Sequence, residues 1–252
     1  MLPRLLRASC RASDAVFCLN RAEVEYLTRH HWVDPTRICL VSNSVERDLF
    51  LAPDHRPVAR RLLFVGQWLP AKGTRYLVHA FSALAARRDV ELVCVGTGVT
   101  PDVVAAAFPD AVRSRVAVRP RLDRVQLAGE LQRADVFVFP SLSEGFSVAL
   151  LEAMAAGLAI VATPAGAAAD LLEHGGNALL VPCADAAALA DGVERMLDDA
   201  PLRQRLGSAA QQRAATFESA RVNVEFTTRL LDVVQSHAAS QGPHAAIDDA
   251  VA

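Results

Sequence analysis

Residues 135–164, DVFVFPSLSEGFSVALLEAMAAGLAIVATP, contain the pattern that decides the fold. The apolar run DVFVFP is followed by a polar turn, a helical segment that begins around Ser147, and a second apolar run, AIVATP. Short runs that are apolar throughout indicate strands buried on both faces, which are typical of parallel sheets. The stretch therefore predicts a unit of strand, helix and parallel strand.

The same alternation extends over most of the chain. Apolar strands and amphipathic helices take turns from RLLFVG at 61–66 to AAALADGVERMLDD at 186–199. This order predicts an α/β fold with a doubly wound, Rossmann-like parallel sheet, in which ligands bind at the carboxyl ends of the strands. A chain of 252 residues with 52% hydrophobic residues has ample material for such a core.

The pattern divides the chain into four parts. Residues 1–56 contain a helical segment, short strands and a proline-bearing linker, and are expected to be the last unit of another α/β domain. We expect the main domain to span 57–215. A long helical pattern from 202 to 234 is expected to end in a C-terminal return helix at 216–235. Residues 236–252 have little patterning and are expected to form a disordered tail.

Composition argues against several classes of protein. The 26 basic and 28 acidic residues are interspersed, so no basic surface for nucleic acid is expected. Five scattered cysteines without C-x-x-C spacing argue against disulfides and zinc, and favour a reducing, cytoplasmic location. The histidines show no ligand spacing, so no metal or other cofactor is expected. No apolar run reaches the roughly 18 residues of a membrane span, which leaves membrane association unsupported.

Two carboxylates, Glu144 and Glu152, flank the turn between the strand and the helix. At a rise of about 1.5 Å per residue they should lie on the order of 10 Å apart. Glycoside hydrolases hold their carboxylates closer, at about 5 Å or about 6.5 to 9.5 Å. The wider span suits two ends of an elongated ligand, each carboxylate accepting vicinal hydroxyls, with a phosphate at the helix N-terminus between them. Ordinary acidic capping explains the pair equally well.

Lys72 is the only lysine among the 26 basic residues, and it follows a predicted strand at the start of the next helix. Its ammonium could bind a diphosphate as a point charge, although a solvated loop lysine is the alternative. In VCVGTGVTP, at 93–101, Pro101 occupies the place of a third glycine, which argues against an NAD-dependent oxidoreductase. Gly166 either lets the backbone approach a ligand or serves turn geometry.

These stretches resemble the C-terminal half of a family 4 retaining glycosyltransferase of the GT-B fold, over about residues 13 to 232. FVGQWLPAKG resembles the family's Gly-Arg and Lys-Gly pattern, PSLSEGFSVALLEAMAAG its highly specific Glu-x7-Glu motif, and GNALLVPCAD also fits. The resemblance implies retaining sugar transfer from a nucleotide-diphosphate sugar, without a bound metal.

The same resemblance assigns the site residues. Lys72 and Glu144 would be catalytic, with Lys72 on the donor diphosphate, Glu144 on the transferred sugar and Glu152 on the ribose. The implied donor-binding residues are Gly66, Gln67, Lys72, Glu144, Gly145, Phe146, Ser147, Val148 and Glu152.

Two departures from the family pattern stand out. Gln67 occupies the place of an arginine that shares the diphosphate, so weaker donor binding or slower transfer is expected. Most of the acceptor-binding N-terminal domain is also absent, so we expect a truncated hexosyltransferase that needs a missing or separate acceptor domain, with its acceptor unknown. The alternative is a non-catalytic nucleotide-sugar binding or vestigial module. Residues 13–50 and the last helix should expose an apolar patch, suited to a partner or to self-association.

Overall fold

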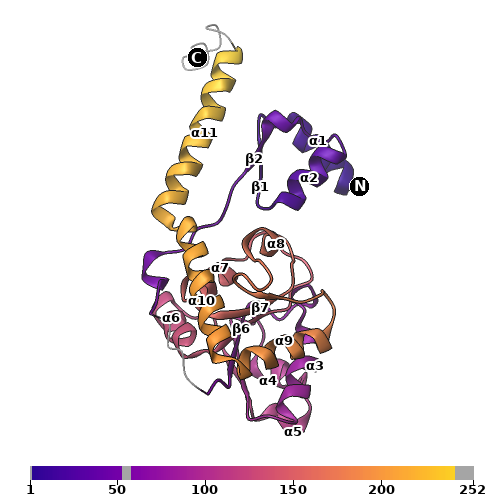
Figure 1. Cartoon of the computed structure of the whole chain (residues 1–252). Coiled ribbons are helices and arrows are strands. Elements are labelled where there is room, and N and C mark those ends of the chain that lie inside the picture. Colours follow the sequence, from indigo (N-terminus) through magenta and orange to yellow (C-terminus); the bar gives the residue numbers. More distant parts are fainter. Residues whose placement is uncertain (1, 53–57, 242–252) are drawn as a thin grey trace, which may run out of the picture. The chain divides into compact units, whose positions relative to one another are not determined.

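The computed structural model describes residues 2–52 and 58–241 (Figure 1). The chain divides into two compact units, one of residues up to Ser42 together with those from Ala220 on, the other spanning Asn43–Ser219. The larger unit thus begins before the expected boundary at residue 56. The reason is that Val45 and Leu49 are buried in the core of the larger unit.

The larger unit contains a six-stranded sheet in the order β5-β4-β3-β6-β7-β8. Every neighbouring pair is parallel, which confirms the predicted doubly wound sheet. The strands are β3 (Arg61–Val65), β4 (Glu91–Val95), β5 (Val116–Arg119), β6 (Val136–Phe139), β7 (Ala159–Ala162) and β8 (Leu179–Leu180).

Helices cover both faces of this sheet. In β3, Leu62 and Phe64 belong to a core cluster shared with α3 and α9, whereas Leu63 belongs to a second cluster shared with α6 and α7. Burial on both faces explains why the strands are apolar throughout. The helices are α3 (Thr74–Ala85), α4 (Pro101–Ala106), α5 (Asp110–Arg113), α6 (Arg124–Arg133), α7 (Val148–Ala155), α8 (Ala168–Leu171), α9 (Ala186–Asp198) and α10 (Ala200–Ala214).

The strand order reverses between β3 and β6. From β3 the chain proceeds outward to β4 and β5, and then returns to place β6 on the other side of β3. At such a reversal the loops that follow the two central strands diverge to opposite faces and leave a crevice at the carboxyl edge of the sheet. The fold therefore provides a ligand-binding position between the loops after β3 and β6.

The smaller unit contains a parallel pair, β1 (Val16–Cys18) and β2 (Ile38–Leu40), with α2 (Arg21–Arg29) and the C-terminal α11 (Ser219–Gln241). An additional helix, α1 (Leu2–Ala12), was not anticipated from the sequence.

The helix α11 packs on the smaller unit through both aromatic and polar contacts. The ring centroids of Phe17 and Phe226 are 5.5 Å apart, and His237 Nδ1 lies 2.9 Å from an Asp14 oxygen. The unit also exposes large apolar side chains of α1, β2 and α11, namely Leu5, Leu6, Leu40, Val224, Phe226, Leu230, Leu231 and Val234. Leu40 and the α11 side chains lie in the two segments where an apolar patch was expected, and the patch itself and its partner stay predictions.

The long helical pattern at 202–234 is two helices rather than one. A short 3-10 turn, η4 (Ala215–Phe217), separates α10 from α11. At this break Val45 donates its amide to the Phe217 carbonyl at 2.9 Å and accepts from the Ser219 amide at 2.9 Å. Backbone groups that would continue the helix are thus used by a β-bridge.

The end of α11 also differs from the sequence-based expectation. The helix continues to Gln241, past the predicted end at 235 and into the segment expected to be a disordered tail. The rest of that predicted tail, 242–252, lies outside the described residues. Within the described part of the chain, no helix is both long and apolar enough to cross a membrane.

Candidate functional site

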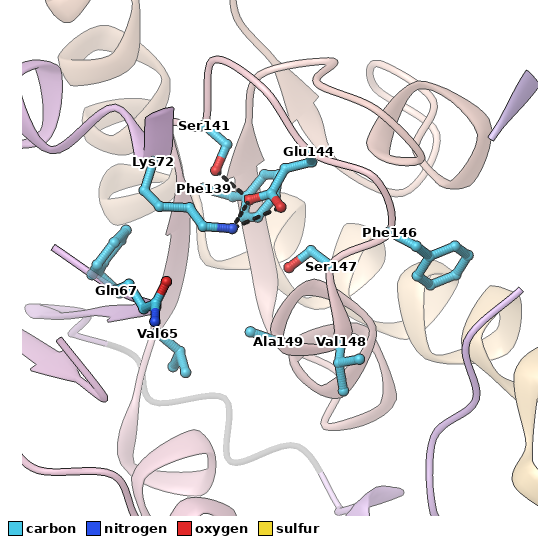
Figure 2. A pocket seen from close by; sticks show the side chains of 12 residues that line it. Val65, Gln67, Lys72, Phe139, Ser141, Glu144, Phe146, Ser147, Val148 and Ala149 are labelled. Carbon is cyan, nitrogen blue, oxygen red and sulfur yellow. Dashed lines mark hydrogen bonds and ion pairs between the residues drawn. The ribbon is translucent and has the colours of Figure 1, made fainter. Parts of the chain in front are cut away.

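The strand reversal brings Lys72 and Glu144 together. Lys72 ends the 3-10 turn η3 (Pro70–Lys72) after β3, and Glu144 lies in the loop after β6. Lys72 Nζ lies 2.6 and 2.7 Å from the two carboxylate oxygens of Glu144 (Figure 2). The Glu144 side chain is 8% exposed and that of Lys72 27% exposed, so the pair is largely shielded from water.

The loop between β6 and α7 is held in place by several other segments of the chain. The Ala71 carbonyl accepts from the amide of Leu142 at 2.8 Å, which ties the loop to the Lys72 turn. The Ala167 amide donates to the Gly145 carbonyl at 2.9 Å, and Asn43 Nδ2 donates to the Phe146 carbonyl at 3.2 Å. These bonds fix the backbone on either side of Glu144.

Two glycines allow the close approach of backbone to this loop. Gly73 has a φ of +68°, and a Cβ there would lie 1.9 Å from the Pro140 carbonyl oxygen. Gly166 has a φ of +56°, and a Cβ there would lie 2.1 Å from the Glu144 carbonyl oxygen. Gly166 therefore lets the turn after β7 approach the Glu144 loop of the same chain. Of the two interpretations given for Gly166, this contact favours a role in backbone geometry over the close approach of a ligand.

The N-terminus of α7 faces the same region. Ser147 is the N-cap, and its hydroxyl accepts from the Leu150 amide at 3.3 Å. Val148 and Ala149 are the first residues of the helix, so their amides have no intrahelical acceptor. Both residues line the cavity beside Lys72 and Glu144. This arrangement of free amides and an ammonium can stabilise an anion.

Lys72, Glu144 and the first residues of α7 line one cavity of about 310 Å³ (Figure 2). Seven of the nine predicted donor-binding residues line it: Gly66, Gln67, Lys72, Glu144, Phe146, Ser147 and Val148. Gly145 and Glu152 do not. The lining residues that sequence reasoning missed are Phe64, Val65, Phe139, Ser141 and Ala149. Ser141 could have been found, because it follows the end of a predicted parallel strand just as Glu144 does.

Glu152 lies one turn of α7 beyond Ala149, outside the cavity lining. Burial raises the pKa of its carboxyl to about 7, and the nearby positive charge of Arg124 opposes part of that shift. Within the described residues its side chain has no hydrogen-bond or ion-pair partner. A partly buried carboxylate without a protein partner is available to ligand hydroxyls.

No cluster of three or more histidine, cysteine, aspartate or glutamate side chains that could hold a metal ion occurs in residues 2–52 and 58–241.

A family model described as glycosyl transferases group 1 matches residues 59–199, which include both loops of the site. The chain belongs to this glycosyltransferase family. A D-inositol 3-phosphate glycosyltransferase of Xylanimonas cellulosilytica is 31% identical over 82% of the chain and 54% of the relative. An MMP alpha-(1->4)-mannosyltransferase of Mycolicibacterium hassiacum is 34% identical over 72% of the chain and 45% of the relative. The glycosyltransferase chain thus spans about half the length of these curated relatives.

Solved structures agree with this assignment. The sucrose-phosphate synthase of Thermosynechococcus elongatus superposes with a TM-score of 0.79 at 25% identity, covering 92% of this chain and 61% of that one. A C-terminal domain of a group 1 glycosyl transferase from Francisella tularensis superposes with a TM-score of 0.59 at 22% identity, over 68% of this chain and 97% of that domain. The predicted family and its GT-B fold are confirmed.

Proposed function

We propose that this chain is the donor-binding part of a retaining hexosyltransferase. It holds a nucleotide-diphosphate sugar in the crevice between the loops after β3 and β6, and the sugar is transferred to an acceptor bound by another domain. The observation that carries the proposal is the shielded pair of Lys72 and Glu144 at the strand reversal, beside the free amides at the start of α7.

Each group of the site suits one part of such a donor. The ammonium of Lys72 and the amides of Val148 and Ala149 bind the diphosphate, because both carry positive charge toward the cavity. The carboxylate of Glu144 accepts sugar hydroxyls, and that of Glu152 accepts the ribose hydroxyls farther along α7. A protein of related fold from Anabaena, 20% identical, was solved in complex with UDP-glucose, which supports this ligand class.

Catalysis by this arrangement is electrostatic. Negative charge grows on the diphosphate as its bond to the anomeric carbon breaks, and preorganised donors stabilise that charge. Lys72 is the only cation among the described residues that line the cavity, since Gln67 contributes a neutral amide. Turnover also needs an acceptor aligned against the sugar and shielded from water, which requires an acceptor-binding domain.

A second candidate is a nucleotide-sugar binding module without turnover. The neutral Gln67, at a position where the sequence resemblance implies an arginine, favours it. Sugar transfer to an acceptor after addition of an acceptor-binding domain separates the two candidates, because a module without turnover binds the donor but transfers nothing.

Calorimetric titration of the chain with UDP, GDP and their hexose conjugates tests the donor-binding proposal. We expect saturable binding of one class of nucleotide at one site per chain. The control is Arg195→Ala, which removes one positive charge from an exposed position on α9 outside the cavity and should bind as the wild type does. Absence of binding by folded wild-type chain contradicts the proposal.

The raised pKa of Glu152 predicts a pH-dependent stability. A folded-state pKa of about 7, above the ordinary 4.5, means that protonation favours the folded state. This contribution is fully present below pH 4.5 and is lost as the pH rises through 7. Glu152→Gln should therefore match the wild type in stability at acid pH and exceed it above pH 7, by at most about 3 kcal/mol. Urea unfolding of both proteins across this pH range measures the difference. If the free energy of unfolding changes with pH in the same way in both proteins, the expectation is contradicted.

A further inference from the structure

We propose that Ser141 is a positioning residue that holds the Glu144 carboxylate for the sugar portion of the donor, an inference that rests on the proposed function. The Ser141 hydroxyl donates to Glu144 Oε1 at 2.8 Å, and Ser141 is 1% exposed. Figure 2 shows Lys72 and Ser141 reaching the same carboxylate from two sides. Glu144 thus has one charged, partly exposed donor and one neutral, buried donor.

The backbone of Ser141 is itself fixed by the neighbouring strand. The Thr163 hydroxyl, which is buried, donates to the Ser141 carbonyl oxygen. The Thr163 amide donates to the Phe139 carbonyl at 2.9 Å, which ties the end of β6 to the residue after β7. Because Thr163 ties the backbone of Ser141 to the end of the neighbouring strand, the Ser141 hydroxyl has little freedom to move, as a positioning group requires.

The two donors to Glu144 respond differently when a nucleotide binds. A diphosphate competes with Glu144 for the Lys72 ammonium, because the ammonium is attracted to both anions. Ser141 also lines the cavity, but its hydroxyl is neutral and is directed at Glu144 Oε1 from a buried residue, so a diphosphate attracts it less than it attracts the ammonium. Once Lys72 turns to the diphosphate, Ser141 keeps the carboxylate in place and leaves its other lone pairs for sugar hydroxyls.

This role predicts a split between two ligands in Ser141→Ala. Affinity for a hexose conjugate, UDP-glucose or GDP-mannose according to the nucleotide that the wild type binds, should fall about tenfold, since a hydrogen bond to a charged group is lost. Affinity for the corresponding nucleoside diphosphate alone should change less than about twofold, because Lys72 and the α7 amides are intact. If Ser141 only supported the fold, Ser141→Ala would lower the affinity for both ligands by the same factor.

Ser143→Ala is the matched control. Ser143 lies in the same loop, is exposed, and bonds to Ala71 through its backbone amide, so the same deletion there should leave both affinities unchanged. Ser141→Cys keeps the size of the side chain but donates weakly, and should lie between the wild type and Ser141→Ala. It also serves if Ser141→Ala fails to fold.

Calorimetry with both ligands decides among the outcomes. The positioning role is supported if Ser141→Ala loses affinity for the sugar conjugate but not for the nucleoside diphosphate, and Ser141→Cys loses an intermediate amount. Unchanged affinity for both ligands, or equal loss of both, overturns it while leaving donor binding intact. Failure of the folded wild type to bind either ligand contradicts the proposed function itself and removes the basis of this inference.

Discussion

Replacing Lys72 by alanine is expected to weaken binding of a nucleoside diphosphate about ten- to a hundredfold, the equivalent of one or more charge-assisted hydrogen bonds. Lys72 is the only lysine of the chain and the only cation among the described residues that line the cavity. The α7 amides remain in the variant, so some affinity should persist. Titration of wild type and variant with the same nucleotide measures the loss.

Replacing Glu144 by alanine should have a different effect on the same two ligands. Glu144 accepts hydrogen bonds from the Lys72 ammonium, so its removal frees that cation, and the nucleoside diphosphate should bind at least as tightly as in the wild type. The hexose conjugate should lose its advantage over the free diphosphate, because its sugar hydroxyls have lost their acceptor. If Lys72→Ala and Glu144→Ala weakened binding of the nucleoside diphosphate equally, the ion pair between Lys72 and Glu144 would serve only the fold.

Gly166→Ala is expected to disrupt the Glu144 loop and to lower the free energy of unfolding by about 2–5 kcal/mol. A left-handed backbone costs an L-residue roughly 1–2 kcal/mol, and forced overpacking typically adds about 1–3 kcal/mol. Both terms apply, since φ is +56° and the new Cβ would meet the Glu144 carbonyl oxygen at 2.1 Å. Displacement of this loop should also reduce donor binding.

Gly175→Ala separates the two causes. Gly175 has a φ of +73°, but a Cβ there would meet no heavy atom within 4 Å. Its substitution should therefore cost only the roughly 1–2 kcal/mol of backbone strain and leave donor binding unchanged. Urea unfolding of both variants makes the comparison. Similar losses in the two would show that the close approach at Gly166 is not important.

The sequence predicted the parallel sheet and named Lys72 and Glu144 as site residues, but it did not predict the direct ion pair between their side chains. Residues that follow neighbouring parallel strands share an edge, so two motifs separated by about seventy residues converge once the strand order is known. The regular alternation of apolar strands with helices made the parallel sheet predictable, whereas the strand order became known only from the structure. The helix N-terminus at Ser147 was predictable as well, because serine before an apolar helical run is a common N-cap.

Other features depend on tertiary contacts that no local pattern contains. The break between α10 and α11 exists because Val45, far away in sequence, takes the backbone bonds around Glu218. The contact of Asn43 with the loop carbonyl of Phe146 also joins segments that are far apart, 103 positions along the chain. Gly166 was recognised as a special position, but its neighbour, the Glu144 loop, became apparent only in three dimensions.

The most direct test of the account is a crystal structure of the chain with a nucleoside diphosphate bound. We expect the diphosphate within hydrogen-bonding distance of Lys72 Nζ and of the amides of Val148 and Ala149. The ribose hydroxyls should bind Glu152, and the Lys72–Glu144 contact should be opened. A nucleotide bound elsewhere, with that ion pair intact and the cavity empty, would contradict the central claim that this cavity is the donor site.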